Sequence, residues 1–208
     1  MNWLFDFDGT LVDSMPTYAS VMTRILDENR IAYETGITKI ITPLGYRDTA
    51  RYFMELGVLH TQEELVAQMT AYAEKEYALN VPAKPHVSEV LRELKARGDD
   101  LNVLTASPHT MLDPCLRRLG LYDLFTNVWS CEDFGMNKAN PEIYRRAAEK
   151  IGAPVEEIWF LDDNLGADRT AKEAGMRVCG VYDDSSAEYE ADIRAVADRY
   201  IRDFSELL

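Results

Sequence analysis

The first apolar run of the chain is short and ends in acidic residues. Trp3 to Phe7 are apolar apart from Asp6, and Asp8 and Gly9 follow directly. A continuous apolar run that stops at a turn signal predicts a strand buried on both faces of a sheet. Residues two apart on a strand point the same way, so we expect Asp6 and Asp8 to face one pocket at the strand's carboxyl end. Gly9 then lets the chain turn away.

From residue 15 to about residue 83 the hydrophobic positions recur at helical spacing, and we expect helices without strands. Ser14, Met15 and Pro16 are typical of a helix start. A second helix is predicted around Arg47 to Leu56, and a capping-box pattern at Thr61 to Glu64 predicts the start of a third. The apolar stripes of the three helices are Tyr18, Val21, Met22, Ile25 and Leu26, then Ala50, Phe53 and Met54, and then Leu65, Met69, Tyr72 and Ala73.

The pattern changes after Pro82 and Pro85, which are typical of a linker. Strands are predicted at 101–105, 128–131, 157–161 and 177–182, with an edge strand at 200–201. Helices are predicted at 87–97, from Asp113 to Gly120, and at 141–151, 166–174 and 186–197. This alternation predicts an α/β fold with a Rossmann-like parallel sheet and helices on both faces. The α/β domain then comprises residues 1–14 and 84–208, interrupted by an all-helical insert at 15–83.

The charge and cysteine content narrow the choice of partners and compartment. There are 36 acidic and 22 basic residues, giving a net charge of −14, which argues against nucleic acid and anionic membranes as partners. We expect neither a signal peptide nor a membrane span, because no apolar run has the required length. The three cysteines are far apart, as expected in the reducing cytoplasm.

Polar side chains follow several of the predicted strands. Asp6 and Asp8 follow the first strand, Thr105 ends the second, and Asp162 and Asp163 follow the strand at 157–161. Lys138 precedes a predicted helix. The carboxyl ends of parallel strands meet at one edge, so these groups are expected in one crevice. Carboxylates suit Mg²⁺, and a hydroxyl, an ammonium and helix N-terminal amides suit a phosphoryl group, so this pattern predicts phosphoryl chemistry.

These residues resemble, in order, the four motifs of the haloacid dehalogenase superfamily, in the phosphatase and β-phosphoglucomutase-like group with a helical cap. The resemblance covers essentially the whole chain, with Asp6 to Ser14 as the first motif. It implies that Asp6 is the nucleophile, forming an aspartyl-phosphate, and that Asp8 is the general acid and then the base. It further implies that Thr105, the Ala106 amide and Lys138 hold the phosphoryl group, and that Mg²⁺ is bound by Asp6, the Asp8 backbone carbonyl and Asp163, with Asp162 acting directly or through a water.

A few positions depart from the family pattern or extend it. Ala139-Asn140-Pro141 stands where Pro-x-Pro is usual, which is expected to loosen this loop, and Asn164 replaces a common serine. Asp168 is a further candidate acid for the metal, although we expect it on the following helix. His109 lies just past Thr105 in the sequence and is a further candidate for a position near the site. Arg47 is the cap residue best suited to an anionic substrate, with a plain surface arginine as the alternative.

The acid at position 8 favours phosphoryl chemistry, because dehalogenases of this superfamily lack it. We expect a Mg²⁺-dependent phosphatase, monomeric or weakly dimeric, for a small phosphorylated metabolite; sugar phosphates and phosphoglycolate both fit. A β-phosphoglucomutase-like phosphotransferase is the alternative, disfavoured because Tyr18 stands where related mutases tend to carry histidine. A phosphonatase would need a cap lysine such as Lys39 or Lys75. A non-catalytic binding protein ranks last, because every catalytic position is filled.

Overall fold

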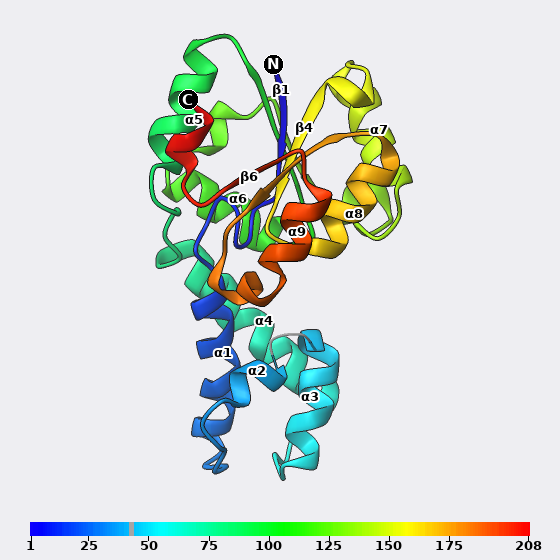
Figure 1. The fold of residues 1–208 in the computed structure, drawn as a ribbon. Helices are drawn as coiled ribbons and strands as arrows, with labels where there is room; N and C mark the ends of the chain where they lie inside the picture. Colours follow the sequence, from blue (N-terminus) through cyan, green and yellow to red (C-terminus); the bar gives the residue numbers. More distant parts are fainter. Residues whose placement is uncertain (42–43) are drawn as a thin grey trace. The chain divides into compact units, whose positions relative to one another are not determined.

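The computed structural model describes residues 1–41 and 44–208. They form two compact units (Figure 1). The sheet unit comprises Met1–Asp13 and Pro82–Leu208, and the helical unit comprises Ser14–Val81. Each unit is described by itself below.

The sheet unit is built on six parallel strands in the order β3-β2-β1-β4-β5-β6. β1 lies at the centre, where Phe5 pairs with Val103 of β2 and with Leu161 of β4. The predicted α/β fold with a parallel sheet is confirmed. The strands are β1 (Asn2–Phe5), β2 (Asp100–Thr105), β3 (Asn127–Ser130), β4 (Ile158–Asp162), β5 (Arg177–Val181) and β6 (Arg199–Ile201).

Helices cover both faces of this sheet, as predicted (Figure 1). On one face, Leu4 and Phe160 pack with Tyr144 of α7 and Ala171 of α8 in a buried cluster. On the other, Phe5 meets Phe125 and Phe204 with ring centroids 6.3 and 6.2 Å apart. Consecutive residues of this buried strand thus pack into the hydrophobic cores on opposite faces of the sheet. The helices are α5 (Val87–Ala96), α6 (His109–Arg118), α7 (Glu142–Ile151), α8 (Leu165–Ala174) and α9 (Glu190–Val196), with short 3₁₀ turns η2 (Tyr122–Leu124), η3 (Cys131–Phe134), η4 (Val155–Glu157), η5 (Asp184–Tyr189) and η6 (Phe204–Leu207).

The strand order places a topological switch point between β1 and β4. The chain continues from β1 through β2 to β3 on one side, and from β4 through β5 to β6 on the other. Connections that leave in opposite directions open a crevice at the carboxyl ends of the two central strands, which is where open α/β sheets bind ligands. Asp6 directly follows β1 and Asp162 ends β4, so both acids lie at this point.

The helical unit contains α1 (Met15–Glu28), α2 (Ile37–Ile41), α3 (Gly45–Glu55) and α4 (Gln62–Leu79). The capping box predicted at Thr61 is present, since its side chain and that of Glu64 each accept the other's backbone amide. The expected all-helical stretch includes Thr42 and Pro43, which lie outside the described residues. The buried side chains of the three longer helices are Val21, Met22, Ile25 and Leu26, then Thr49, Ala50 and Phe53, and then Leu65, Met69, Ala73 and Tyr77.

Several predicted boundaries were wrong. α6 begins at His109 rather than Asp113, because the amides of Met111 and Leu112 already bond to the carbonyl of Pro108, 3.0 Å away in each case. Pro114 therefore lies inside this helix. The helix predicted at 186–197 is a 3₁₀ turn followed by the shorter α9. Met54, predicted for an apolar stripe, is 43% exposed.

The three cysteines, Cys115, Cys131 and Cys179, are buried free thiols. Among the described residues, no helix combines the length and apolar character needed to cross a bilayer.

Candidate active site

The structure brings polar groups from four segments of the sheet unit to the carboxyl ends of β1, β2 and β4. Asp6 continues the β1 ladder by one residue, because its amide donates to the carbonyl of Leu161 over 2.8 Å. Thr105 is the last residue of β2, and Asp162 and Asp163 lie at the end of β4. Lys138 comes from the loop between η3 and α7. Residues distant in sequence therefore meet because parallel strands end at one edge.

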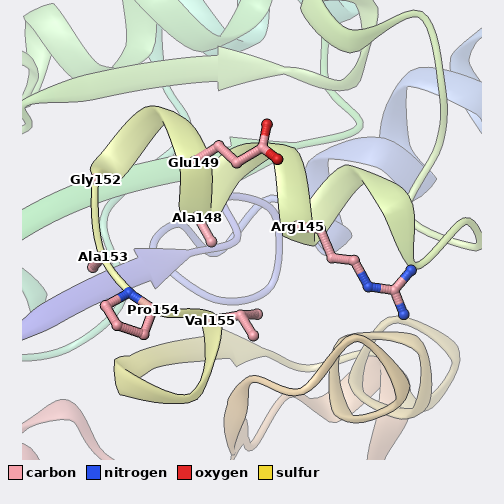
Figure 2. Close-up of a pocket in the computed structure, with 7 residues that line it drawn as sticks. All are labelled: Arg145, Ala148, Glu149, Gly152, Ala153, Pro154 and Val155. Carbon is pink, nitrogen blue, oxygen red and sulfur yellow. The ribbon is translucent and has the colours of Figure 1, made fainter.

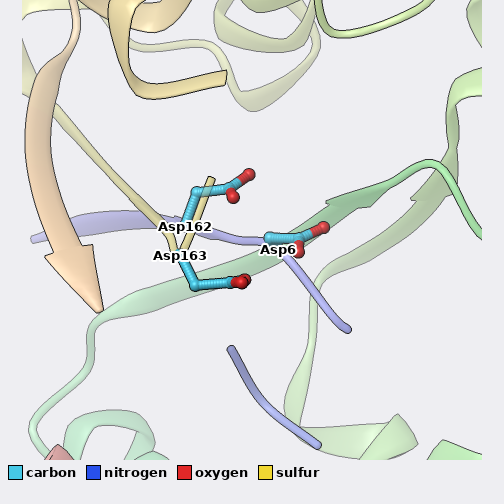
Figure 3. Close-up of side chains that lie close together, drawn as sticks. All are labelled: Asp6, Asp162 and Asp163. Carbon is cyan, nitrogen blue, oxygen red and sulfur yellow. The ribbon is translucent and has the colours of Figure 1, made fainter. Parts of the chain in front are cut away.

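Three of the acids form a buried cluster. Asp6, Asp162 and Asp163 each present an oxygen, and these oxygens all lie within 4.8 Å of one another. Figure 3 shows the three side chains pointing to the same side. Carboxylate oxygens are the ligands preferred by hard divalent cations such as Mg²⁺, and a buried group of acids needs positive charge nearby. The donor set therefore fits a divalent metal ion.

Lys138 supplies one positive charge to this cluster. Its Nζ donates to Oδ1 of Asp6 and, over 2.8 Å, to Oδ2 of Asp162. The lysine side chain is only 14% exposed, so these pairs are poorly screened by water. Lys138 thus joins the ends of β1 and β4 through one ammonium group.

The pKa values show that one lysine does not balance the acids. Burial, with the charges of Asp162 and Asp8, raises the pKa of Asp6 to about 7, although Lys138 opposes this. Burial and the charges of Asp162 and Asp6 raise the pKa of Asp163 well above its usual value. Burial alone would lower the pKa of Lys138, but Asp162 and Asp6 raise it well above its usual value. A divalent cation at this place would relieve the remaining repulsion.

Asp8 has a different partner from Asp6. The hydroxyl of Ser107, two residues beyond Thr105, donates to Oδ2 of Asp8. Thr105 is buried, and its Oγ1 accepts the amide of Ser107 over 3.1 Å, which forms a tight turn after β2. Ala106, between them, is exposed. The segment that ends β2 therefore holds the side chain of Asp8.

The turn after β1 is closed on itself and packed against Asp163. The amides of Leu11 and Val12 both bond to the carbonyl of Phe7, at 2.9 and 3.0 Å. Gly9 has φ +73°, and a Cβ placed there would lie 2.6 Å from Oδ2 of Asp163. Thr10 Oγ1 donates to Oδ1 of Asp163 over 3.2 Å. Glycine is required here both by the left-handed backbone and by the close carboxylate.

The two departures from the family pattern are stabilised locally. Asn164 caps α8, its Oδ1 accepting the amides of Gly166 and Ala167 at 2.9 and 3.1 Å. In the loop around Lys138, the Oδ1 of Asn137 accepts the amide of Ala139 over 3.1 Å, and that of Asn140 accepts the amide of Glu142 over 3.0 Å. The loop expected to be loose thus contains two side-chain-supported turns.

Three further residues considered from the sequence lie outside the acidic cluster. Asp168 is on α8, as expected, and is fully buried, with neither oxygen hydrogen-bonded within the described structure. Burial, followed by the charges of Asp162 and Asp163, raises its pKa to about 9. His109 is held by two carboxylates, Nδ1 by Asp113 and Nε2 by Asp133, each at 2.8 Å. Arg47 is an exposed residue of α3 in the helical unit.

Two contributors were missed by the sequence reasoning. Tyr144 is buried, and its hydroxyl lies 3.2 Å from the carbonyls of both Lys138 and Ala167, so it supports the lysine loop against α8. Its place in an apolar stripe predicts burial but not this hydrogen bond. Lys84 bonds to the turn after β1, although its neighbours Pro82 and Pro85 favour a plain linker.

A separate surface pocket of about 300 Å³ is formed by the end of α7 and the loop after it. Figure 2 shows its lining, from Arg145 to Val155. None of the clustered acids lies among its lining residues, so it is distinct from the candidate active site.

Comparisons with known proteins identify the family of this chain. Residues 3–181 match the family model of the haloacid dehalogenase-like hydrolases. Validoxylamine A 7'-phosphate phosphatase from Streptomyces hygroscopicus subsp. limoneus is 24% identical, with 98% of this chain and 94% of the relative covered. Phosphoglycolate phosphatase from Escherichia coli K12 is 25% identical, with 85% and 79% covered.

A solved structure shares the fold of this chain. The crystal structure of a candidate β-phosphoglucomutase from Thermotoga maritima superimposes with a TM-score of 0.86 at 24% identity, covering 100% of this chain and 96% of the other. The match to the family model confirms the predicted superfamily and the predicted enzyme class, a hydrolase, and the named relatives support phosphatase activity. The chain belongs to the haloacid dehalogenase-like hydrolases.

Proposed function

We propose that this protein is a Mg²⁺-dependent phosphatase that hydrolyses a small phosphorylated metabolite through an aspartyl-phosphate on Asp6. The observation that carries the proposal is the buried group of Asp6, Asp162 and Asp163 with Lys138 at the switch point of the sheet. Such a site offers a carboxylate nucleophile, a cation for the phosphoryl oxygens and oxygen ligands for a divalent ion.

In the first proposed step, a carboxylate oxygen of Asp6 attacks phosphorus and the bond to the leaving alkoxide breaks. Asp8 gives its proton to that alkoxide, so the alcohol leaves neutral. Lys138, the Thr105 hydroxyl and the Ala106 amide hold the phosphoryl oxygens, whose charge must be compensated through the transition state. The hydrogen bond from the Ser107 hydroxyl holds one oxygen of Asp8 in place, which supports the role of Asp8 as the proton donor.

In the second proposed step, water attacks the phosphorus of the aspartyl-phosphate. Asp8, now a carboxylate, takes a proton from this water, and the bond to Asp6 breaks to release inorganic phosphate. Both carboxyl groups return to their starting states, so the cycle is balanced. Asp6, the Asp8 backbone carbonyl, Asp163 and, directly or through a water, Asp162 would hold Mg²⁺, which when bound neutralises phosphoryl charge.

The deciding experiment measures phosphate release from a panel of phosphorylated metabolites with Mg²⁺ and with EDTA. Wild type, Asp6→Asn and the control Asp123→Asn, an exposed acid outside the cluster, are compared. We expect Mg²⁺-dependent release by wild type and the control and none by Asp6→Asn. Release by folded Asp6→Asn at the wild-type rate would contradict the nucleophile. If no ester is hydrolysed, glucose 1-phosphate isomerisation tests the mutase alternative.

The substrate class is proposed from the relatives' names. Phosphoglycolate and 7'-phosphorylated validoxylamine A belong in the first panel, because enzymes named for them are similar to this chain. We further propose that the helical unit acts as a cap in which Arg47 favours anionic substrates. Arg47→Ala is expected to raise KM for an acidic phosphate ester and to leave KM for p-nitrophenyl phosphate unchanged.

The cellular setting is proposed separately. Three buried free thiols support a reducing, cytoplasmic location. We also propose a monomer or weak homodimer, which light scattering over a concentration series would test.

A further inference from the structure

Lys84 is a nearly buried lysine of the sheet unit, with its side chain 14% exposed. Its Nζ lies 2.7 Å from the carbonyl of Gly9, 2.5 Å from that of Tyr182 and 3.0 Å from Oδ2 of Asp183. An ammonium group has three donors, and each finds an acceptor here. One side chain therefore joins the turn after β1 to the segment that follows β5.

The backbone around Lys84 is also hydrogen-bonded to the turn after β1. Its amide donates to the carbonyl of Leu11 over 3.0 Å, and the amide of Asp13 donates to the carbonyl of Pro82 over 3.0 Å. Val12 and Ala83 form an antiparallel bridge between these two bonds. The segment at 82–84 is therefore paired with the end of the turn, and the lysine side chain reaches back to its beginning at Gly9.

The position of the Gly9 peptide affects two residues of the candidate active site, Asp8 and Asp163. Gly9 follows Asp8 directly, and a Cβ added to it would lie 2.6 Å from Oδ2 of Asp163. The next residue, Thr10, donates to the other oxygen of Asp163. A shift of the Gly9 peptide would therefore move Asp8 and change the support of Asp163 together.

Asp183, the acidic partner of Lys84, is itself held by hydrogen bonds. It is buried at 5% exposure, and its Oδ1 accepts both the amide and the hydroxyl of Ser185, at 2.9 and 2.6 Å. Its Oδ2 is the oxygen paired with Lys84. Removing one member of a buried ion pair leaves the other charge uncompensated, so Lys84 and Asp183 must be tested as a pair.

We propose that Lys84 is a positioning residue, which holds the turn from Asp8 to Val12 against Asp163 and so sets the geometry of the metal-binding and proton-transfer groups. This inference rests on the proposed phosphatase function and assigns a part of it to a residue outside the four motifs. Lys84 acts through Gly9 and does not touch the reacting atoms.

The test compares Lys84→Met, the double variant Lys84→Met/Asp183→Asn and the control Lys172→Met, which removes the exposed pair of Lys172 with Asp198 in the same unit. The double variant removes the buried charge left by the single one, so it is expected to fold where the single variant is unstable. Three quantities are measured on the folded proteins: amide hydrogen exchange in residues 8–13, Mn²⁺ binding by electron paramagnetic resonance, and kcat with Mg²⁺.

We expect faster exchange in residues 8–13, and Mn²⁺ affinity and kcat each reduced about 10-fold, in both Lys84 variants. The double variant should have a higher unfolding temperature than Lys84→Met but the same fast exchange, weak Mn²⁺ binding and low kcat. The control Lys172→Met should match wild type in all of these measurements. Lys84→Arg should lie closer to wild type than Lys84→Met in all three readouts. A double variant with wild-type exchange and Mn²⁺ affinity would overturn the proposal, leaving Lys84 only as the counter-charge of Asp183. If wild type hydrolyses no ester, the proposed function fails, and hydrogen exchange and Mn²⁺ binding still decide the role of Lys84.

Discussion

Gly9 and Asp163 approach each other so closely that a single methyl group would not fit between them. A Cβ at Gly9 would lie 2.6 Å from Oδ2 of Asp163 and 2.7 Å from its carboxyl carbon. The turn that carries Asp8 is therefore packed directly against Asp163, the residue after β4, although the two are more than 150 residues apart in sequence.

Gly9→Ala should separate these two groups. The positive φ and the overlap with Asp163 together are expected to cost about 1–3 kcal/mol of unfolding free energy. Because the clash falls on a proposed metal ligand, Mn²⁺ affinity should also fall, by about 10-fold. Urea unfolding and Mn²⁺ titration measure the two effects. Gly36→Ala is the matched control, since Gly36 has φ +100° but nothing within 4 Å of its added Cβ; an equal loss of Mn²⁺ affinity in both variants would contradict this account.

Lys138→Met should abolish most of the activity. The charge of Lys138 lowers the pKa of Asp6, so its loss should raise that pKa further above about 7 and leave Asp6 protonated at neutral pH. Because the variant also lacks a proposed donor to the phosphoryl oxygens, kcat is expected to fall about 100-fold or more. Steady-state kinetics from pH 6 to pH 9 measure this. Retention of kcat within threefold by folded Lys138→Met would show that the lysine is not needed for turnover.

Ser107→Ala should affect substrates according to their leaving group. Ser107 fixes Asp8, the proposed proton donor, and an alkoxide needs a proton whereas p-nitrophenolate needs little help. We expect kcat for an alkyl phosphate to fall about 10-fold, with a smaller change for p-nitrophenyl phosphate. Ser107→Thr keeps the hydroxyl and should stay near wild type. Equal losses on both substrates would argue against a role through Asp8.

Asp168→Asn should stabilise the protein in EDTA at alkaline pH. The pKa of Asp168 is raised from its model-peptide value of 3.8 to about 9, so the folded protein holds this proton more tightly than the unfolded chain. The stability that the folded protein gains by holding this proton on Asp168 is fully present below pH 4 and is lost as the pH rises toward 9. The variant should gain on the order of 1–3 kcal/mol at pH 9 and nothing at pH 4. Thermal unfolding followed by circular dichroism decides; parallel pH profiles for both proteins would contradict a buried, protonated Asp168.

Mg²⁺ should stabilise the folded protein in proportion to its binding. At a concentration of about 100 times Kd, the unfolding free energy should rise by about 2.7 kcal/mol, and EDTA should remove this gain. Asp163→Asn should lose most of the gain because it removes a proposed, buried ligand, whereas the exposed control Asp123→Asn should keep it. Equal stabilisation of wild type and Asp163→Asn would place the ion elsewhere.

Some features were readable from the chain because they depend on neighbours in sequence. The buried strand that precedes Asp6, the capping box at Thr61 and the alternation of strands and helices after Pro85 all follow from local patterns. The limits of α6 and of the 184–196 region were not readable, because hydrogen bonds at Pro108 and Asp183 decide where those turns begin.

The sequence by itself determined which residues are candidates for the site, because motifs at the ends of parallel strands meet at one edge of the sheet. Only the tertiary structure decided how they are charged and held. The pairing of Lys138 with two acids, of Ser107 with Asp8 and of Lys84 with Gly9 joins residues 24 to 132 positions apart. Contacts of this kind depend on the order of the strands in the sheet and on which side chains are buried away from water. Neither the strand order nor the burial can be read from a local stretch of sequence.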